Sequence, residues 1–295
     1  MGLPRRDRPP GPSLITEREL YMYVQTLEGL GLGFGQPQPP KLQQPAIRKK
    51  YVSNVVAYKD TKNKCQSTNC SIYVPSALRN PKAIDVLVFF HGLLPICDSA
   101  HNFDPDRLIK KFQMDVQVDT DPQLALAVPI VLWNTDDRRF GIIQAAWSAA
   151  YLNAFVEEVL DQIGKSYGAR PQLGRLILAG HSAAYDILTP LAEQFECGIA
   201  ETKKGALAKL ERVVAMDTTY RPRDAKALEQ WARNLATVRF NLVLSKSDPS
   251  VAVWQGWEKT RKKTTGQNRP TNLRVFHNLA FGHCDLPANF LITYI

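Results

Sequence analysis

Short apolar runs recur along most of this chain, separated by segments long enough to form helices. The runs are IDVLVFF, LALAVPIVLWN, RLILAG, RVVAMD, FNLVLS and LRVFHNLA, between residues 84 and 280. Continuous apolar runs of this length indicate strands buried on both faces, as in parallel sheets. Helical patterns fill the intervals, at residues 144–163, 182–196, 224–235 and 251–263. Strands that alternate with helices pair in parallel through right-handed crossovers, so the sequence predicts an α/β fold with a doubly wound, mostly parallel sheet.

Residues 1–50 differ in composition and are predicted to be a partly disordered extension of the main domain, residues 51–295. Prolines punctuate the extension, and its Gly- and Pro-rich segment from Gly29 to Lys41 is typical of a linker. Residues 15–30 have the spacing of one short amphipathic helix. At the start of the main domain, VSNVVAY and CSIYVP flank a polar stretch, which predicts an antiparallel hairpin.

The formal net charge of +9 is compatible with acidic partners. The densest basic runs, residues 48–50 and 261–263, adjoin polar loop sequence and lack the interleaved aromatic residues of nucleic-acid sites, so no nucleic-acid partner is expected. No apolar stretch is long enough to cross a bilayer, and no apolar signal region follows the basic first residues. We therefore expect a cytoplasmic protein, or one exported without a standard signal peptide. The oligomeric state is left open.

The five cysteines have no zinc-ligand spacing, so no metal site is expected. Cys65 and Cys70 flank the turn-like sequence QSTN and can close a small disulfide in an oxidising compartment. Cys97, Cys197 and Cys284 are isolated in the sequence. Free thiols are the general expectation.

A candidate nucleophile lies in the segment LAGHSAAY, residues 178–185. An apolar strand leads directly into Gly180-His181-Ser182, and a helical pattern follows at once. A serine at such a sharp strand-to-helix turn presents its hydroxyl above the sheet edge, and small neighbours are needed because the turn is crowded. The helix N-terminus behind it offers unpaired N–H groups to a developing oxyanion. Ala184 replaces the last glycine of the usual G-x-S-x-G pattern, and helix capping is the alternative role for Ser182.

This segment resembles the nucleophile turn of the α/β-hydrolase superfamily, of the serine esterase and lipase type, and the resemblance covers roughly residues 51–295. The stretch His91-Gly92-Leu93, which follows the strand VLVFF, looks like the oxyanion loop of that superfamily. The resemblance implies an oxyanion hole formed by the backbone N–H of Gly92 or Leu93 together with that of Ala183. His91 is then expected to order this loop beside the substrate rather than to transfer protons.

A hydroxyl group needs a nearby base, and histidine is best matched to neutral pH. In the superfamily the base follows the last strand, and His283 lies in the loop after LRVFHNLA. His277 lies inside that predicted strand. His181 adjoins the nucleophile but is expected to point elsewhere. His283 is therefore the predicted base.

Two carboxylates preserve the superfamily's chain order of serine, acid and histidine. Asp217 ends the run RVVAMD, and Asp248 follows FNLVLS, which is the superfamily's commonest acid position. The pair Asp248-Pro249 also has the pattern of a helix cap, a structural role that Asp217 lacks. Residues 180–185 and 217–220 are similar to bacterial hydrolase-like proteins with paired HS-x-AY and D-x-x-Y motifs. The sequence narrowly favours Asp217 and leaves Asp248 as the alternative.

These features predict a cofactor-independent serine hydrolase that acts through an acyl-enzyme on a carboxylic ester, or less readily on an amide. The substrate class is a small-molecule ester or a lipid or polymer ester. Trp133 and Tyr185 are candidate walls of the acyl pocket, with an ordinary place in the core as the alternative. The competing function is a binding or effector module that keeps the hydrolase fold without its activity.

Overall fold

The computed structural model describes residues 46–59, 65–78, 82–92, 104–130, 147–246, 248–277 and 281–291 of the 295-residue chain. Backbone contacts divide the chain into residues 1–42 and residues 43–295, and every described residue belongs to the second unit. The short helix predicted at residues 15–30 lies outside the described residues. The first strand begins at Ile47, within the stretch that the sequence assigns to the extension.

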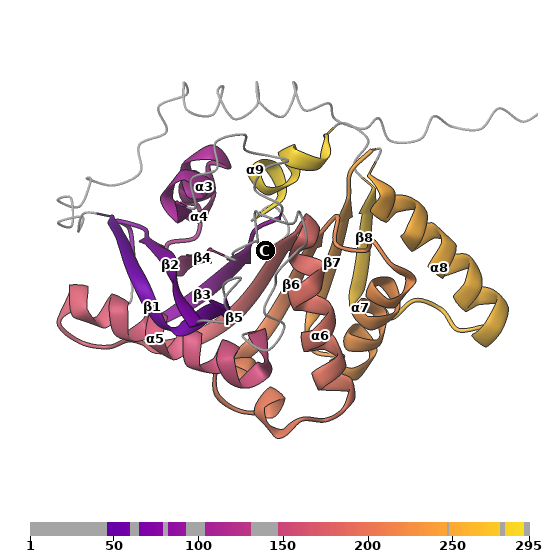
Figure 1. Ribbon diagram of the computed structural model, residues 1–295, viewed down its shortest axis with the longest axis horizontal. Coiled ribbons are helices and arrows are strands. Elements are labelled where there is room, and N and C mark those ends of the chain that lie inside the picture. The colour runs from indigo at the N-terminus through magenta and orange to yellow at the C-terminus, as the bar shows by residue number, and fades with distance from the viewer. Residues whose placement is uncertain are drawn as a thin grey trace, which may run out of the picture. The chain divides into compact units, whose positions relative to one another are not determined.

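Eight strands of the described residues form one sheet, in the order β1-β2-β4-β3-β5-β6-β7-β8 (Figure 1). The pairs β1–β2 and β2–β4 are antiparallel, and all pairs from β4 to β8 are parallel. The predicted mostly parallel sheet and its N-terminal hairpin are therefore confirmed. The strands are β1 (Ile47–Lys59), β2 (Cys65–Val74), β3 (Ala83–Phe90), β4 (Leu124–Pro129), β5 (Gln172–His181), β6 (Leu210–Met216), β7 (Arg239–Leu244) and β8 (Leu273–His277).

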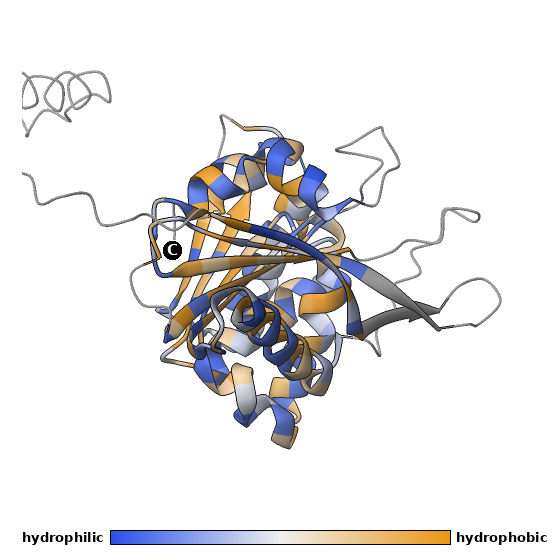
Figure 2. Cartoon of the chain, turned by 90° about the vertical axis from the view of Figure 1, so that its left-hand side faces the viewer, coloured by the Kyte–Doolittle hydropathy of each residue, from blue (hydrophilic) through white to orange (hydrophobic). Residues whose placement is uncertain are grey.

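Helices cover both faces of the sheet, which explains why the strand sequences are continuously apolar. Along β3, Val86 and Val88 belong to one core while Leu87 and Phe89 belong to the other, and all four are fully buried. Figure 2 shows mostly hydrophobic strands between helices of mixed polarity. The first core includes residues of α5 (Ala149–Tyr167), α6 (Tyr185–Glu196), α7 (Pro222–Asn234) and α8 (Pro249–Thr265), and the second includes residues of α3 (Pro105–Lys111), α4 (Met114–Val118) and α9 (Leu286–Phe290). Among the described helices, none is both long and apolar enough to span a bilayer.

Helix α8 has the capped start that its sequence predicts. Asp248 is the N-cap, its carboxylate accepts a hydrogen bond from the Ser250 N–H at 2.9 Å, and Pro249 occupies the first turn. The helix stops at Gly266, whose φ of 64° is a left-handed conformation that glycine adopts without strain. Because β7 ends at Leu244, this cap holds the Asp248 carboxylate just beyond the carboxyl end of the sheet.

The cysteine predictions need two corrections. Cys70 is a free, buried thiol, so the proposed disulfide with Cys65 is wrong. Both residues belong to the same extended strand, where five residues span about 17 Å, whereas a disulfide requires Cα atoms within about 7 Å. Cys284 is disulfide-bonded, so the expectation of a free thiol is wrong at that position as well. Cys197 is free, as expected.

Candidate active site

Ser182 occupies the turn between β5 and α6, where the short 3-10 helix η2 (Ser182–Ala184) links the two elements. Its φ of 54° is a left-handed conformation that costs a non-glycine residue about 1–3 kcal/mol and that clusters at functional sites. The residue is 4% exposed. The alternative role as the cap of α6 is wrong, because Ala184 occupies the cap position and Ser182 lies inside η2.

The turn is crowded, as a nucleophile turn should be. A Cβ atom on Gly180 would lie 2.8 Å from Leu188 Cδ1 and 2.9 Å from the Ala184 Cβ. Glycine is therefore required at position 180, and the free space that it leaves accommodates the methyl group of Ala184. This contact explains how the turn forms with alanine where the usual pattern has a second glycine.

The loop after β3 lies directly against Ser182. A Cβ atom on Gly92 would lie 2.6 Å from the Ser182 Cβ and 3.0 Å from His181 Nδ1. No side chain fits there, so the Gly92 backbone lies beside the serine, where an oxyanion donor is needed. Ala183 follows the serine in η2 and is 3% exposed. Leu93, the other predicted oxyanion residue, lies outside the described residues.

His91 stabilises this loop from a fully desolvated position. It is 1% exposed, and its Nδ1–H donates to the Gly92 carbonyl at 2.7 Å. Burial lowers the pKa of His91 to about 4, which the hydrogen bond to Gly92 only partly opposes. The ring is therefore neutral near pH 7. This arrangement fits the predicted ordering role of His91.

The ring of His283 faces two carboxylates. It lies in the 3-10 helix η5 (His283–Asp285) after β8, and its Nδ1 is 2.9 Å from Asp217 Oδ2 and 3.0 Å from Asp248 Oδ2. The two candidate acids from the sequence thus converge on one nitrogen atom. A histidine oriented through Nδ1 in this way can use its other ring nitrogen, Nε2, for acid–base chemistry.

Asp217 is held rigidly at the end of β6. It is 0% exposed and has a φ of 48°. Its Oδ1 accepts hydrogen bonds from the Ser245 N–H and from the Ser250 hydroxyl, both at 2.9 Å. These bonds leave Oδ2 directed at His283.

Asp248 combines the cap of α8 with the contact to His283. Its Oδ1 accepts the Ser250 N–H, while its Oδ2 accepts the Tyr220 hydroxyl at 2.7 Å. Burial alone would raise the pKa of Asp248. His283, Ser250 and Tyr220 outweigh that effect and lower the pKa to about 2. The structural and functional interpretations of Asp248 are therefore both satisfied by one side chain.

The carboxylate pair makes His283 unusually basic. Burial lowers its pKa, but the hydrogen bonds and charges of Asp217 and Asp248 outweigh burial and raise the pKa to about 9. At pH 7 only about 1% of such a ring is in the neutral form that can accept a proton. The His283 ring is therefore mostly protonated at neutral pH and becomes neutral under alkaline conditions.

Two side chains complete the site. His181 lies beside His283 rather than pointing elsewhere, since its ring centroid is 4.5 Å away and its Nε2–H donates to the His283 carbonyl at 2.9 Å. The Tyr220 hydroxyl interacts with the Ser182 side chain as well as with Asp248. The role of Tyr220 was not assigned from the sequence, although the D-x-x-Y motif that begins at Asp217 contains it.

Tyr185 and Trp133 were the predicted walls of an acyl pocket. Tyr185 begins α6, and its ring centroid lies 5.4 Å from that of Tyr220 and 4.4 Å from the Arg221 guanidinium. Tyr185 is therefore close to the nucleophile and to the tyrosine that contacts it. Trp133 lies outside the described residues.

Asp217, Asp248 and His283 are also the one group in the described part of the chain with the residue types of a metal site, with ligand atoms within 4.8 Å of one another. Each carboxylate oxygen already accepts a hydrogen bond from the protein. The Nδ1–H of His283 lies between the two carboxylates, where a cation would have to displace it. These contacts fit an imidazolium better than a metal ion.

The order in which the site residues follow the strands identifies the type of fold. The serine follows the central strand β5, one acid follows β6, the other follows β7, and the histidine follows the edge strand β8. This is the order of serine, acid and histidine on the carboxyl edge of a parallel sheet. The fold is of the α/β-hydrolase type.

Comparisons with known proteins gave structural neighbours of low sequence identity. No family model and no curated protein matches the chain. A solved ferulic acid esterase is 16% identical, with a TM-score of 0.46 over 81% of this chain and 91% of its own. A ferulic acid esterase of Anaeromyces mucronatus is 13% identical, with a TM-score of 0.48 over 87% and 91%. An S-formylglutathione hydrolase of Agrobacterium tumefaciens is 12% identical, with a TM-score of 0.43 over 87% and 95%.

Proposed function

We propose that this protein is a serine hydrolase of carboxylic esters that works through an acyl-enzyme. The observation that carries the proposal is the convergence of Asp217 and Asp248 on His283 Nδ1, beside a serine with a φ of 54°. Structural ion pairs also perturb histidine, but they do not require a strained serine at the same sheet edge.

In the proposed reaction, the Ser182 hydroxyl attacks the ester carbonyl while His283 Nε2 accepts its proton. The carboxylates of Asp217 and Asp248 stabilise the imidazolium that forms. The backbone N–H of Ala183, with that of Gly92 or Leu93, stabilises the tetrahedral oxyanion. His283 then protonates the leaving alcohol, and a water molecule activated by the same ring hydrolyses the acyl-enzyme.

We assign Asp217 as the principal acid and Asp248 as a second carboxylate on the same ring. Asp217 is the more deeply buried of the two, with side-chain exposures of 0% and 7%. Its Oδ1 is fixed by two donors, so its position does not depend on the start of α8. A carboxylate held in this way can fix the Nδ1–H tautomer that the mechanism requires.

The competing function is a binding module without activity, and the raised pKa of His283 favours it at neutral pH because little free base is present. A fluorophosphonate probe distinguishes the two when it is applied across neutral and alkaline pH. We expect labelling that strengthens as the pH rises and that disappears in Ser182→Ala. Ser166→Ala, an exposed position on α5, is the matched control and should label like the wild type. Absence of labelling at every pH in folded wild-type protein would refute the hydrolase proposal.

A paired assay tests the preference for esters. Activated phenyl esters and anilides with the same acyl group differ only in the leaving group. We expect turnover of the ester alone, in the same pH range as probe labelling. Equal turnover of the anilide would show that the ester assignment is wrong, while leaving the nucleophile in place.

A further inference from the structure

Four arginines lie on one face of the sheet, near the amino ends of four adjacent parallel strands. Arg212 of β6 is the register partner of Ile177 on β5 and of Arg239 on β7. Arg175 is two residues before Ile177, and Arg274 of β8 pairs with Asn241, two residues after Arg239. Side chains two residues apart on a strand share a face, so all four arginines project from the same side.

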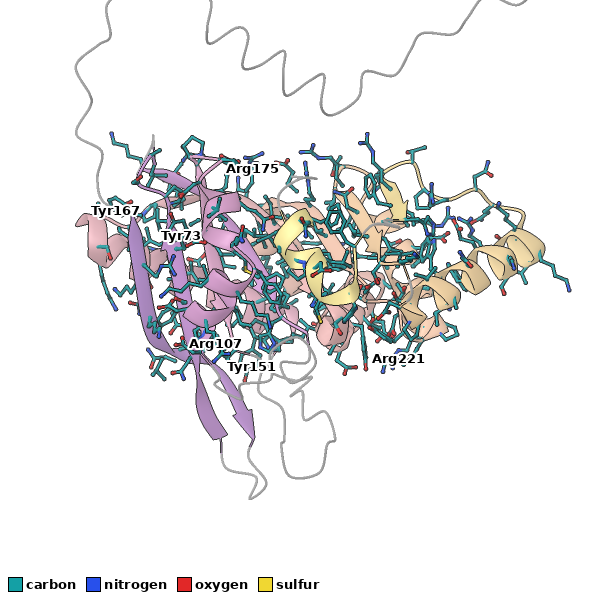
Figure 3. The ribbon with its side chains drawn as sticks, turned by 90° about the horizontal axis from the view of Figure 1, so that it is seen from above. Tyr73, Arg107, Tyr151, Tyr167, Arg175 and Arg221 are labelled. Carbon is teal, nitrogen blue, oxygen red and sulfur yellow. The ribbon has the colours of Figure 1, made fainter. Side chains whose placement is uncertain are left out.

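The same face becomes apolar toward the carboxyl ends of the strands. Ile177, Val214, Val243 and Phe276 continue the four rows and pack into or against the core that includes α3, α4 and α9. In the view of Figure 3, Arg175 lies at the edge where β5 begins, and Arg221, which follows the end of β6, lies at the opposite edge. The arginines therefore form a basic end to an otherwise apolar face.

Two of the four arginines are neutralised by carboxylates. Arg175 contacts Asp85 at 2.5 Å and Glu211 at 3.4 Å, and Arg239 also pairs with Glu211. In contrast, Arg212 and Arg274 form no ion pair with any residue in the described ranges. The cluster thus contains two guanidinium groups whose charges are not neutralised locally.

Arg212 is the decisive member because it is deeply buried. The residue is 3% exposed, and its Nε is a buried nitrogen with no hydrogen-bond partner. Burial, followed by the charge of Arg239, lowers the pKa of Arg212 to about 10, so the group is still protonated at neutral pH. A buried charge is strongly unfavourable unless an opposite charge or hydrogen-bond acceptors accompany it. The unpartnered Nε of Arg212 indicates that an acceptor group from outside the described chain belongs beside it.

We propose that Arg212 and Arg274 bind a phosphate group that carries two negative charges. Two unneutralised guanidinium groups match a dianion, and the planar donor fork of arginine matches phosphate oxygens. Their positions in the sheet differ by two strands and two residues, so their Cα atoms are roughly 12 Å apart. Long side chains can converge on one ligand across that distance. Arg175 and Arg239 add positive potential at the rim.

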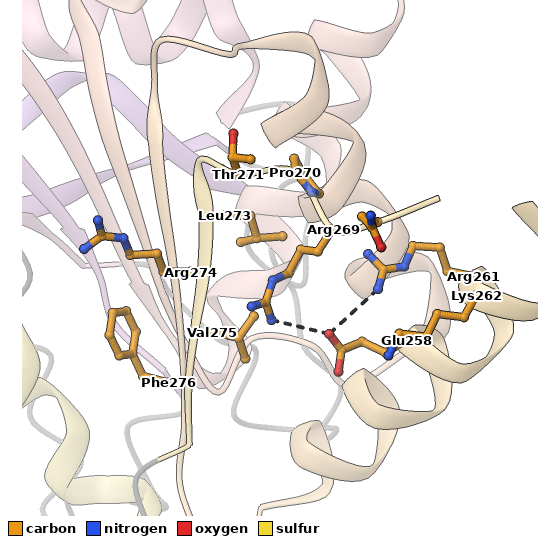
Figure 4. Close-up of a pocket in the computed structure, with 11 residues that line it drawn as sticks. Glu258, Arg261, Lys262, Arg269, Pro270, Thr271, Leu273, Arg274, Val275 and Phe276 are labelled. Carbon is orange, nitrogen blue, oxygen red and sulfur yellow. Dashed lines mark hydrogen bonds and ion pairs between the residues drawn. The ribbon is translucent and has the colours of Figure 1, made fainter. Parts of the chain in front are cut away.

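The rest of such a ligand can extend past Arg274, which is exposed on the edge strand β8. A pocket of about 600 Å³ lies along β8, and the side chains of Arg274 and Phe276 project from the side of that strand that faces away from α8 (Figure 4). On the other side of the strand, Arg269 pairs with Glu258 at 3.4 Å. Arg261, which also lines the pocket, is held by Glu229 at 3.3 Å. Both of these arginines are therefore engaged on the α8 side of β8, whereas Arg274 is available to an anion on the opposite side.

The phosphate site is separate from the proposed hydrolase site. Arg212 and Asp217 are five residues apart on the extended β6 segment, which corresponds to about 16 Å. The inference rests on the fold and the charges of the arginine face, and it does not depend on the activity of Ser182. Loss of one function in a variant would therefore leave the other testable.

Calorimetric titration with inorganic phosphate tests the proposal, with chloride used to hold the ionic strength constant. We expect saturable binding to the wild type and no binding to Arg212→Met. Arg274→Gln and Arg212→Lys should bind at least about tenfold more weakly, because each loses a charge-assisted contact or the donor fork. Arg170→Gln, an exposed arginine paired with Glu157 and Asp161, is the control and should match the wild type. Equal affinity in Arg212→Met and in the control would overturn the proposal.

A second measurement, the melting temperature, tests whether Arg212 has only a structural role. In phosphate-free buffer, Arg212→Met should raise the melting temperature, because it removes a buried and unpaired charge. Phosphate should raise the melting temperature of the wild type but not that of the variant. A variant that is less stable without phosphate and still responds to it contradicts the inference. Binding only to vesicles with phosphatidic acid, or only to nucleic acid, without binding to inorganic phosphate would also exclude the proposed small dianion.

Discussion

Replacing Asp248 by asparagine removes one of the two charges on His283 while preserving most contacts of the side chain. Asparagine is as good a helix cap as aspartate, so the Ser250 N–H keeps its acceptor at the start of α8. The amide NH2 then occupies the position of Oδ2 and can donate to the oxygen of the Tyr220 hydroxyl. The principal change is therefore electrostatic, at a distance of 3.0 Å from His283 Nδ1.

The expected shift follows from the contacts of the imidazole. Its pKa is raised from 6.5 to about 9 by two carboxylates at similar distances, against the opposing effect of burial. Removing one opposite charge at such a distance lowers a pKa by roughly 1 to 2 pH units. At pH 7 the neutral fraction of His283 then rises from about 1% to roughly 10–50%. The plateau rate at high pH falls, because the lost charge also stabilised the imidazolium in the transition state.

The assay is the pH dependence of kcat/KM on an activated ester, which reports the ionisation of the free enzyme. In the wild type we expect activity to increase with pH, with its midpoint near the His283 pKa of about 9. In Asp248→Asn the midpoint should move to lower pH and the plateau should fall moderately. Asp217→Asn should instead lower the plateau by up to about 10⁴-fold, because an amide at that position can select the wrong imidazole tautomer.

Three outcomes of this comparison refute the reasoning. An unchanged midpoint in Asp248→Asn would show that its charge does not influence the base. A plateau that falls as far in Asp248→Asn as in Asp217→Asn would remove the distinction between principal and second acid. Full activity in both variants would show that His283 is not oriented by either carboxylate. Tyr220→Phe is the matched control for loss of the hydroxyl contact to Asp248 without loss of its charge.

Three further predictions follow from the same contacts. Because the folded-state pKa of His283 lies above 6.5, its contribution to stability is complete below pH 6.5 and is lost as the pH rises through about 9. Denaturant unfolding should show a loss of about 3 kcal/mol in the free energy of unfolding over that range. His283→Gln should abolish this pH dependence. Ser182→Gly and Ser182→Ala should both be inactive. The glycine variant should melt about 2 °C or more above the alanine variant, because glycine adopts a φ of 54° without strain. Equal melting temperatures of the two variants would argue against strain at this position. Reducing the Cys284 disulfide should lower ester hydrolysis, because it releases the residue next to His283. Unchanged activity in a fully reduced protein would contradict this.

The sequence was sufficient to predict those parts of the site that depend on chain order. Ser182 follows an apolar strand and precedes a helix, and His283 follows the last strand, so each could be placed at the sheet edge without knowledge of side-chain contacts. The sequence separates Asp217 from Asp248 only narrowly, and the reason is physical. In a sequence, a cap role and a catalytic role are alternatives for one aspartate, whereas in the structure one oxygen of Asp248 caps α8 and the other contacts His283.

Features that depend on contacts between residues far apart in the sequence could not be predicted from it. The position of Tyr220 between Ser182 and Asp248 requires β6 and β7 to be adjacent, which their sequences do not specify. The disulfide bond of Cys284 has no signal in its isolated position in the sequence. The arginine face depends on register, because one additional residue in β6 before Arg212 would move its side chain to the opposite face.

The backbone itself marks the proposed site. Ser182 and Asp217 are two of the three non-glycine residues with positive φ in the described part of the chain, and they directly follow the neighbouring strand segments that end at His181 and Met216. Strain at both positions costs about 1–3 kcal/mol each and persists only where surrounding contacts enforce it. For Asp217 those contacts are the hydrogen bonds from Ser245 and Ser250. For Ser182 they are the close approaches of Gly92 and Gly180 to the turn. A chain selected only for stability would replace Ser182 with glycine, so its retention under strain argues for a role of the hydroxyl group in chemistry.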